Sequence, residues 1–290
     1  MATIEPLFDL ESIPNLPDNL LPFPHQVGGH GSKETSLEFE MLRDPVERIF
    51  YKMVPGDERS IREANFYLSV FADAAPPEIM QLREVIPTFR GIFKVPSSGV
   101  MYIALEDLTA DMANPSVCDL KMGQFACPPD AGDKKIQHEM AKYPDRGTVG
   151  FLLTGMKVYD KKASQYLTVP RYYGRTVPAE YVFERGLLPF LQGDFDLAKS
   201  FLPLISKVRS IFVDKPKLPI ALYSSSLLLI YDENRTNLIA KLVDFAHWRP
   251  APEADDPSGV VRGFDTLIEN FSRSNSSLSL KFDTPFVEMK

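Results

Sequence analysis

Two apolar runs joined by a short polar turn constrain the fold of this 290-residue chain most strongly. Residues 221–248 read ALYSSSLLLIYDENRTNLIAKLVDFAHW, in which large apolar side chains flank the polar sequence DENRTN. Such a pair of runs predicts a β-hairpin. Residues 150–175 repeat the pattern, with DKKAS as the turn. We therefore expect the larger part of the chain to be built on antiparallel strands.

Segments of helical periodicity lie around these strands. In residues 57–74, Ile61, Ala64 and Leu68 fall on one face, which predicts a helix. Further helices are predicted at 132–144, at 178–213 in two pieces broken near QGDFD, and at 259–273. Strands are predicted at 48–54, at 114–124 and in GVMYIALEDLTA, which carries Glu106 and Asp107 near its end. This order of elements predicts an α+β fold with antiparallel sheets and two lobes.

The distribution of proline, serine and charge divides the chain further. Five prolines fall within the first 24 residues, which predicts an irregular arm on the surface. The expected parts are the arm at 1–24, a small lobe at 25–108, a larger lobe at 109–271 and a Ser-rich tail at 272–290.

Composition excludes several classes of protein. The net charge is −7, which disfavours DNA as the main ligand. The two cysteines form no disulfide framework, and no Cys or His pair has metal-ligand spacing. The N-terminus lacks the basic and apolar regions of a signal peptide, and no run reaches the roughly 18 apolar residues of a membrane span. We expect a soluble, intracellular monomer.

Charged residues stand on or beside the predicted strands at Lys52, Asp119, Lys121 and Asp244. A charge in a partly buried site is costly unless it is paired or meets a ligand. Taken singly, each of these residues could be a strand residue whose side chain points to solvent. Together with Glu63 on the first helix they match the parts of a phosphoryl-transfer site. The HRD and DFG segments of protein kinases are absent, and VDFAH has Ala where a protein kinase has Gly.

Six short motifs carry a family resemblance, in order along the chain. PSVCDLKMG (115–123) fits P-x-x-x-D-x-K-x-G, the signature of the inositol polyphosphate kinases. The other five motifs are HQVGGH (25–30), REANFY (62–67), YYGR (172–175), SSLL (225–228) and VDFAH (243–247). The chain therefore resembles this family from residue 25 to about residue 270. Residues 134–159 are most similar to the multikinase branch, while HQVGGH and DLKMG also occur in the hexakisphosphate kinases.

The resemblance implies roles for the charged residues. Lys121 would contact both the acceptor and the γ-phosphate of ATP, and Asp119 would orient either the attacking hydroxyl or the ATP ribose. Asp244 would hold Mg²⁺. The implied ATP-binding residues are Lys52 with its partner Glu63, Glu106 and Leu108 at the adenine, Ser225 and Asp244.

The acceptor pocket must hold several phosphates, which Lys and Arg bind well. The residues that the resemblance places there are Lys121, Lys135, Gln137, Lys157, Arg175 and His247. Glu139 departs from the family pattern, because an acidic side chain that faced a phosphate would be unfavourable. That departure bears on substrate choice, and especially on any activity towards a membrane phosphoinositide.

The expected activity is an ATP- and Mg²⁺-dependent kinase that converts inositol tris- and tetrakisphosphate to the pentakisphosphate, in the nucleus and cytoplasm. The alternatives are an inositol hexakisphosphate kinase that makes pyrophosphates, and a non-catalytic scaffold with the same fold.

Overall fold

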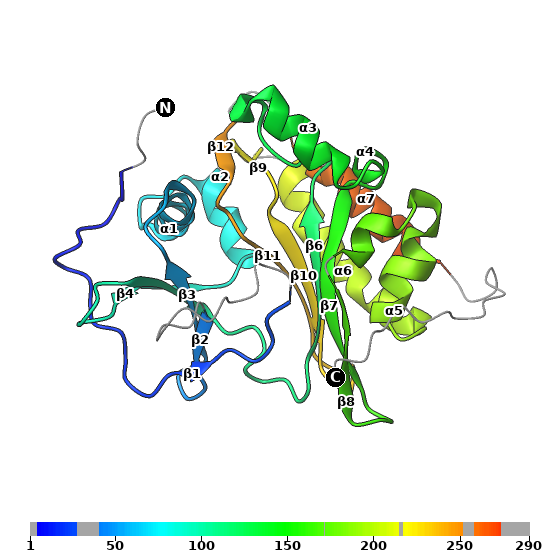
Figure 1. The fold of residues 1–290 in the computed structure, drawn as a ribbon, viewed down its shortest axis with the longest axis horizontal. Coiled ribbons are helices and arrows are strands. Elements are labelled where there is room, and N and C mark those ends of the chain that lie inside the picture. The colour runs from blue at the N-terminus through cyan, green and yellow to red at the C-terminus, as the bar shows by residue number, and fades with distance from the viewer. Residues whose placement is uncertain (1–4, 28–40, 171, 215–216, 252–257, 274–290) are drawn as a thin grey trace.

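The computed structural model describes residues 5–27, 41–170, 172–214, 217–251 and 258–273. Two sheets stand side by side, one built from the first third of the chain and one from the rest (Figure 1). We call the first sheet with its helix α1 the small lobe, and the second sheet with its helices the large lobe. The expected α+β class with antiparallel sheets is confirmed. The predicted domain boundary at 108/109 falls in the connection between the sheets and stays a prediction.

The small lobe is an antiparallel five-stranded sheet in the order β1-β2-β3-β5-β4. Its helix α1 (Glu58–Phe71) begins at Asp57, whose side chain accepts a hydrogen bond from the Ser60 amide. The predicted strand at 48–54 and helix at 57–74 are confirmed. The strands are β1 (Leu21–Pro22), β2 (Met41–Asp44), β3 (Ile49–Val54), β4 (Phe89–Lys94) and β5 (Met101–Glu106).

The large lobe is a second antiparallel sheet in the order β11-β10-β6-β7-β8. Both predicted hairpins are confirmed, as β7 with β8 and β10 with β11. The short strands β9 and β12 form a separate pair that the sequence did not predict. The strands are β6 (Ser116–Met122), β7 (Phe151–Asp160), β8 (Gln165–Val169), β9 (Ile220–Leu222), β10 (Ser226–Tyr231), β11 (Leu238–Val243) and β12 (Trp248–Pro250).

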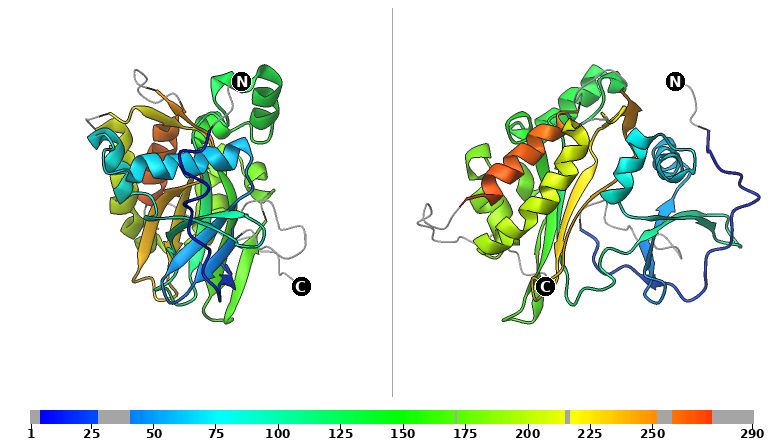
Figure 2. Two further views of the ribbon diagram at one scale, coloured as in Figure 1. Left: turned by 90° about the vertical axis from the view of Figure 1, so that its left-hand side faces the viewer. Right: turned by 180° about the vertical axis from the view of Figure 1, so that it is seen from behind.

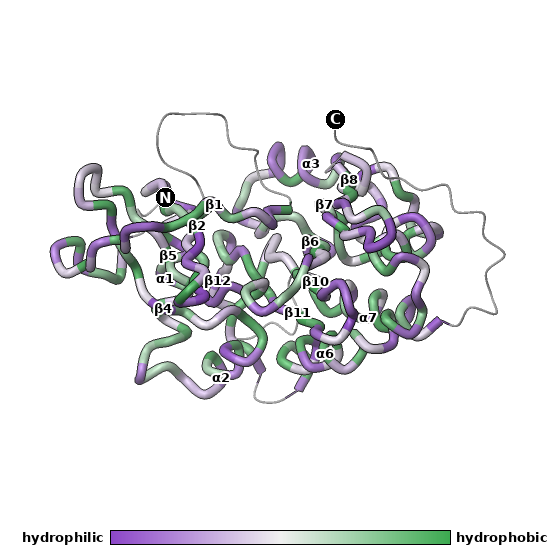
Figure 3. Tube along the Cα trace, turned by 90° about the horizontal axis from the view of Figure 1, so that it is seen from below, coloured by the Kyte–Doolittle hydropathy of each residue, from purple (hydrophilic) through white to green (hydrophobic). Residues whose placement is uncertain are grey.

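Two long helices, α6 (Phe195–Val213) and α7 (Val260–Phe271), cover one face of the second sheet (Figure 2). Apolar and polar residues both occur along each of them, as expected for helices with one buried face (Figure 3). The predicted break near QGDFD is confirmed, because Asp194 caps α6 through hydrogen bonds from the amides of Asp196 and Leu197.

Shorter helical segments complete the large lobe and the connection to it. The predicted polar helix is confirmed as α3 (Asp133–Ala141). Residues 179–190 form a succession of short turns rather than one regular helix. The remaining segments are α2 (Pro77–Met80), α4 (Arg146–Val149), α5 (Leu188–Phe190), a π-helix (Val182–Leu187) and 3-10 turns at Gln81–Glu84, Pro129–Ala131, Tyr173–Thr176 and Ala179–Tyr181.

The N-terminal arm packs more closely than the sequence predicted. It is irregular over most of residues 5–20, as expected, but Leu16 and Leu20 pack on the face of the first sheet that carries Tyr51 and Tyr102. Residues 21–22 extend that sheet. In HQVGGH, the positions after Val27 lie outside the described residues, as does the predicted tail beyond residue 273.

Helix α1 connects the two lobes. The ring of Phe66 stacks on Phe245 at 3.9 Å between centroids, and the Trp248 indole N–H donates to the Arg62 carbonyl at 3.2 Å. One apolar cluster therefore extends from the small lobe to α6 and α7. Among the described residues, no helix is long and apolar enough to cross a membrane.

Candidate active site

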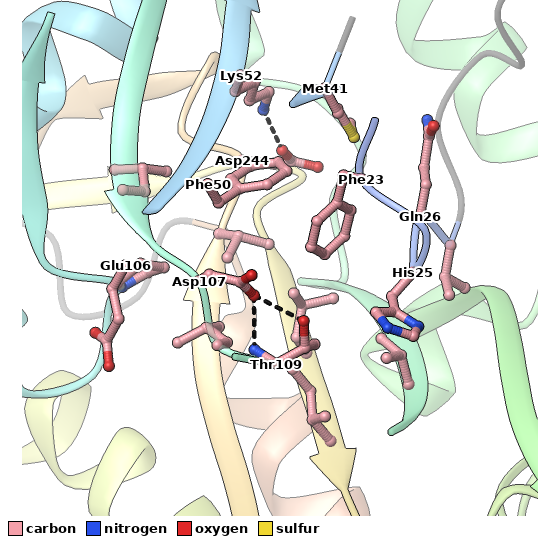
Figure 4. A pocket seen from close by; sticks show the side chains of 18 of the residues that line it. Phe23, His25, Gln26, Met41, Phe50, Lys52, Glu106, Asp107, Thr109 and Asp244 are labelled. Carbon is pink, nitrogen blue, oxygen red and sulfur yellow. Dashed lines mark hydrogen bonds and ion pairs between the residues drawn. The ribbon is translucent and has the colours of Figure 1, made fainter. Parts of the chain in front are cut away.

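An open cleft lies where the two sheets meet. Its walls come from the arm, β3, α1, the end of β5, β6, β10 and the end of β11 (Figure 4). Apolar side chains such as Phe50, Leu105 and Val243 line one part, and Lys52, Glu63, Asp119 and Asp244 line the other. A flat apolar group and a charged group can therefore bind next to each other.

Lys52 lies at the centre of the charged part. Its Nζ is 2.9 Å from Glu63 Oε1 on α1 and 2.5 Å from Asp244 Oδ1 just after β11. The predicted pairing of Lys52 with Glu63 is therefore present, and Asp244 is a second partner that the sequence did not indicate. Asp244 has φ of 65°, in the left-handed region that a non-glycine residue rarely adopts. Such strain is often found at functional sites.

Lys52 interacts favourably with both carboxylates, but burial raises the pKa of Glu63, an effect that the Lys52 charge opposes and the Asp244 charge adds to. Burial disfavours the charged form of Lys52 and would lower its pKa. The negative charges and hydrogen bonds of Asp244 and Glu63 have a larger effect, so the pKa of the lysine is raised. Lys52 holds the pKa of Asp244 below its ordinary value, so this carboxylate stays ionised. The Asp244 side chain remains 46% exposed, which leaves room for a cation beside it.

Asp119 points into the same cleft from the middle of β6. It is buried, and its Oδ1 has no hydrogen-bond partner among the described residues. Burial, with a smaller effect from Asp244, raises its pKa to about 6. A buried carboxyl with one free oxygen and a pKa close to neutral suits a group that accepts a hydrogen bond or a proton from a ligand.

The chain that leaves β5 forms the far wall of the cleft. The Glu106 side chain turns away and accepts hydrogen bonds from the amide and hydroxyl of Thr88 (Figure 4). The Glu106 amide donates to Thr88 O and the Asp107 amide to Arg48 O. Asp107 Oδ1 accepts from the amide and hydroxyl of Thr109, which fixes the turn. The predicted adenine contacts at Glu106 and Leu108 can therefore come from the backbone rather than from the Glu106 carboxylate.

A group of cations lies beside the cleft, around His247. Burial, together with the charges of Lys135, Arg59, Lys121 and Arg249, lowers the pKa of His247 to about 4. Lys121 is opposite Ser226 on β10, and Ser226 is in turn opposite Val243, so Lys121 and Asp244 lie at the same end of the sheet. The charge of Lys121 also lowers the pKa of Asp244. We call Arg59, Lys121, Lys135, Arg249 and His247 the cationic cluster.

Four of the predicted site residues are placed elsewhere. Ser225 is buried behind β6, where its carbonyl accepts from the Met122 amide, and it does not line the cleft. Gln137 is exposed on α3. Arg175 lies in a 3-10 turn whose Gly174 packs against the Leu153 carbonyl of β7. Lys157 is opposite Val117, at the other end of β6 from Lys121, and binds the arm.

Two residues near the site, Gly123 and Glu139, are constrained by neighbouring protein groups. A Cβ on Gly123 would lie 2.9 Å from the Ser258 carbonyl oxygen, and its φ is 97°, so packing within the protein requires glycine there. Glu139 forms an ion pair with Lys142, which lowers its pKa against the effect of burial. Its negative charge is therefore partly compensated.

Sequence reasoning missed three arginines at the site. Arg59 and Arg249 belong to the cationic cluster, but each stands in a polar segment with no pattern to distinguish it. Arg146 is buried, and it donates to Gly123 O at 2.8 Å and to Met122 O at 3.0 Å. It fixes the end of the signature strand, although nothing in YPDRGTVG indicates a buried charge.

Two sheets that face each other across a cleft with a Lys–Glu–Asp cluster define a two-lobed, kinase-like fold. Residues 102–272 match the family model described as inositol polyphosphate kinase. The chain belongs to the inositol polyphosphate kinase family.

Individual relatives agree with this assignment. The chain is 32% identical to the inositol polyphosphate multikinase of Rattus norvegicus over 232 residues, which is 77% of this chain and 57% of the relative. It is 35% identical to inositol hexakisphosphate kinase 1 of Mus musculus over 164 residues, 54% of this chain and 37% of that protein. The chain thus spans little more than half the length of the multikinase.

Solved structures support the fold. The inositol phosphate multikinase of S. cerevisiae, in complex with ADP and Mn²⁺, aligns with a TM-score of 0.61 and 22% identity, over 76% of this chain and 97% of that one. A second structure of an inositol phosphate multikinase aligns with a TM-score of 0.59 and 25% identity, over 72% of this chain and 97% of that one.

Proposed function

We propose that this chain is an ATP-dependent kinase that phosphorylates inositol tris- and tetrakisphosphate to the pentakisphosphate. The observation that carries the proposal is the register of Lys121: it lies opposite Ser226, at the end of the sheet where Asp244 follows β11, and its charge acts on both Asp244 and His247. A donor phosphate and a polyanionic acceptor can then meet at one lysine.

The nucleotide would bind in the cleft. Its adenine would lie against the apolar walls near Leu105 and Val243, with Leu108 at its edge, and its phosphates would reach Lys52. The yeast relative with ADP and Mn²⁺ supports a nucleotide and a divalent cation in this family.

A divalent cation fits the chemistry of Asp244. Its carboxylate is partly exposed and held ionised by Lys52. The described residues contain no group of three or more Asp, Glu, His or Cys that could hold a metal. One protein carboxylate together with nucleotide phosphates is an ordinary way to bind Mg²⁺. When bound, the ion would neutralise phosphate charge during transfer.

The acceptor would bind in the cationic cluster. Arg59, Lys135 and Arg249 supply positive charge, and His247 stays neutral at pH 7 because its pKa is about 4. A neutral imidazole can donate a hydrogen bond to a phosphate or accept one from a ring hydroxyl. The ion pair of Glu139 with Lys142 limits the repulsion between Glu139 and the acceptor phosphates.

In the reaction, an acceptor hydroxyl oxygen forms a bond to the γ-phosphorus of ATP, and the bond to the β–γ bridging oxygen breaks. Lys121 would stabilise the negative charge on the transferred group. Asp119 would accept a hydrogen bond from either the attacking hydroxyl or the ATP ribose; an attacking hydroxyl would lose its proton to Asp119 or to solvent. Positioning and charge stabilisation dominate such transfers, so little help from a base is needed.

The test is an acceptor comparison with the purified chain, Mg²⁺ and ATP. Inositol trisphosphate and inositol hexakisphosphate are offered side by side, and products are separated by charge. Stepwise conversion of the trisphosphate to the pentakisphosphate supports the proposal. Conversion of the hexakisphosphate alone would move the chain to the pyrophosphate-forming branch, and ATP binding without transfer to either would favour a scaffold. A parallel reaction with a phosphoinositide in vesicles tests whether the chain also phosphorylates a membrane lipid. The nuclear and cytoplasmic location and the monomeric state stay predictions.

A further inference from the structure

Residues 21–27 join the two lobes; we call them the strap. Its β1 residues pair with β2, and the Phe23 amide donates to the Met41 carbonyl at 3.1 Å, which fixes this part to the small lobe. The next residue is bound to the other lobe, because the Pro24 carbonyl accepts from Lys157 Nζ on β7 at 2.7 Å. Two consecutive residues are thus tied to opposite sides of the cleft.

The strap is also a wall of the cleft. Phe23, His25, Gln26 and Val27 all line it. The Phe23 ring packs on Phe50 with 4.8 Å between centroids. Figure 4 shows Phe23 beside Phe50 near the middle of the cleft, with His25 and Gln26 to one side and Glu106 on the far side. A nucleotide in the cleft would therefore contact the strap directly.

Lys157 is surrounded by aromatic side chains where the strap meets the large lobe. Its ammonium lies 4.5 Å from the centroid of the Tyr166 ring, which packs on Tyr159 and lies 6.1 Å from the His25 ring. Burial, with a smaller effect from the charge of Lys157, lowers the pKa of His25 to about 4, so His25 is neutral beside the lysine at pH 7. Lys157 lies opposite Val117, at the other end of β6 from Lys121.

The prolines of the strap limit the hydrogen bonds that its own backbone can donate. Pro22 and Pro24 have no amide proton to donate. The carbonyl of Pro24 therefore matters, and a charged donor makes a stronger hydrogen bond than a neutral one. Val27 also packs against Val117 and Ile230 of the large lobe, so loss of that donor would free Pro24 and the adjoining Phe23 from the large lobe, while Val27 stayed packed there and β1 stayed paired with β2.

We propose that Lys157 is a positioning residue for the nucleotide. By holding Pro24 on the large lobe it keeps Phe23 in the wall of the cleft, and so it sets the affinity for ATP rather than for the inositol polyphosphate. This inference rests on the proposed function for the identity of the nucleotide. It differs from the role in acceptor binding that the family resemblance implied for Lys157.

The test measures the Kd of Mg–ATP by calorimetry with the full chain. Lys157→Met keeps the apolar stem over Tyr166 but removes the donor. It should weaken ATP binding about tenfold, the size expected for one charged hydrogen bond. Lys157→Arg should restore binding to within about twofold, because it can still donate. Lys161→Ala is the matched control: it lies in the exposed turn after β7, bonds to Asn234, and should leave the Kd unchanged.

A double-mutant cycle separates positioning from a general structural effect. Phe23→Ala removes the wall itself, so Lys157→Met should add less than about twofold in that background. The KM for inositol trisphosphate should stay constant in every Lys157 variant, and thermal unfolding checks that each variant is folded.

The outcomes separate this inference from the proposed function. If the wild type binds no ATP, the proposed function fails and this inference fails with it. If the wild type binds ATP and Lys157→Met binds it equally well, only the inference is overturned. It is also overturned if the KM for the acceptor rises while the Kd for ATP is unchanged, or if the effects of Phe23→Ala and Lys157→Met simply add.

Discussion

The ammonium group of Lys52 lies 2.5 Å from the carboxylate of Asp244, although 192 positions separate the two residues. Lys52 belongs to the small lobe and Asp244 follows the last long strand of the large lobe. The pair therefore spans the cleft. It places a group that binds phosphate beside a group that binds a divalent cation, and Mg–ATP needs both.

Replacement of Asp244 by Asn should abolish most of the activity. The amide keeps the size of the side chain but loses the charge that a metal ion requires. We expect kcat at saturating ATP to fall on the order of a hundredfold or more. The control is Asp265→Asn, which removes a surface ion pair with Arg209 and should leave kcat unchanged. A fall of less than threefold in Asp244→Asn would contradict the metal role.

Loss of Lys52 should destabilise the fold through Glu63. The Glu63 side chain is 6% exposed and would be left as an unpaired buried charge in Lys52→Met. We expect a cost of about 2–4 kcal/mol in the free energy of unfolding, measured with urea. Lys52→Met combined with Glu63→Gln should recover most of that stability, because the uncompensated charge is removed. An equal loss in the single and double variants would show that the Lys52–Glu63 pair is not the cause.

The ionised Asp119 side chain should lower the stability of the fold but support the activity. Its pKa in the folded state is about 6, above the ordinary 3.8, so the folded state binds more protons between these values. Stability should therefore fall as pH rises from about 4 to 6, and the penalty should persist at pH 7. Asp119→Asn should raise the free energy of unfolding at pH 7 by about 1–3 kcal/mol while it removes most of the activity.

The same carboxyl should shape the pH profile of the enzyme. If the ionised form of Asp119 is the active one, kcat should fall as pH is lowered through about 6. The exposed Asp196→Asn is a control for stability and for the profile. Destabilisation of Asp119→Asn at pH 7, with Asp196→Asn unchanged, would contradict the assignment of a raised pKa.

Arg59 should bind the acceptor. Arg59 is exposed on the first turn of α1, and its charge contributes to the lowered pKa of His247. Arg59→Ala should raise the KM for inositol trisphosphate about tenfold and leave the KM for ATP unchanged, because one charged contact to a phosphate is lost. Arg62→Ala, one turn along the same helix, breaks an ion pair with Glu58 instead and serves as the control. Equal effects of both variants on the two KM values would argue against an acceptor contact.

Arg146 should support the end of the signature strand. Arg146→Met leaves the carbonyls of Gly123 and Met122 without their buried donor. The expected loss is about 2–4 kcal/mol in the free energy of unfolding, measured with urea. The exposed Arg262→Ala, which loses a hydrogen bond to the Thr148 carbonyl, should cost less than about 1 kcal/mol.

Much of the fold could be predicted because its elements are periodic. The hairpins, α1 and α7 each carry a regular pattern of apolar residues, and the Lys52–Glu63 pair joins a strand to the helix that follows it. The signature PSVCDLKMG identified β6 and its two charges. These features depend on residues that are close in sequence, or on a motif that the family shares.

The rest could not be predicted because it depends on packing between distant segments. The contact of Asp244 with Lys52 requires the two sheets to face each other and Asp244 to adopt a positive φ. Arg59 and Arg249 come from polar segments and meet only at His247. Lys157 stands in a strand whose sequence gives no sign of a special role for this lysine. Its partner Pro24 lies in an irregular segment whose course no sequence pattern specifies.

The central claim is phosphoryl transfer at Lys121, and the most direct measurement follows label from γ-³²P-ATP into inositol trisphosphate. The reaction is run with Mg²⁺ for the wild type, for Lys121→Ala and for the control Lys199→Ala, whose exposed lysine pairs with Asp196 on α6. We expect label in the higher phosphates for the wild type and Lys199→Ala, and almost none for Lys121→Ala with ATP still bound. Equal transfer by Lys121→Ala would contradict it.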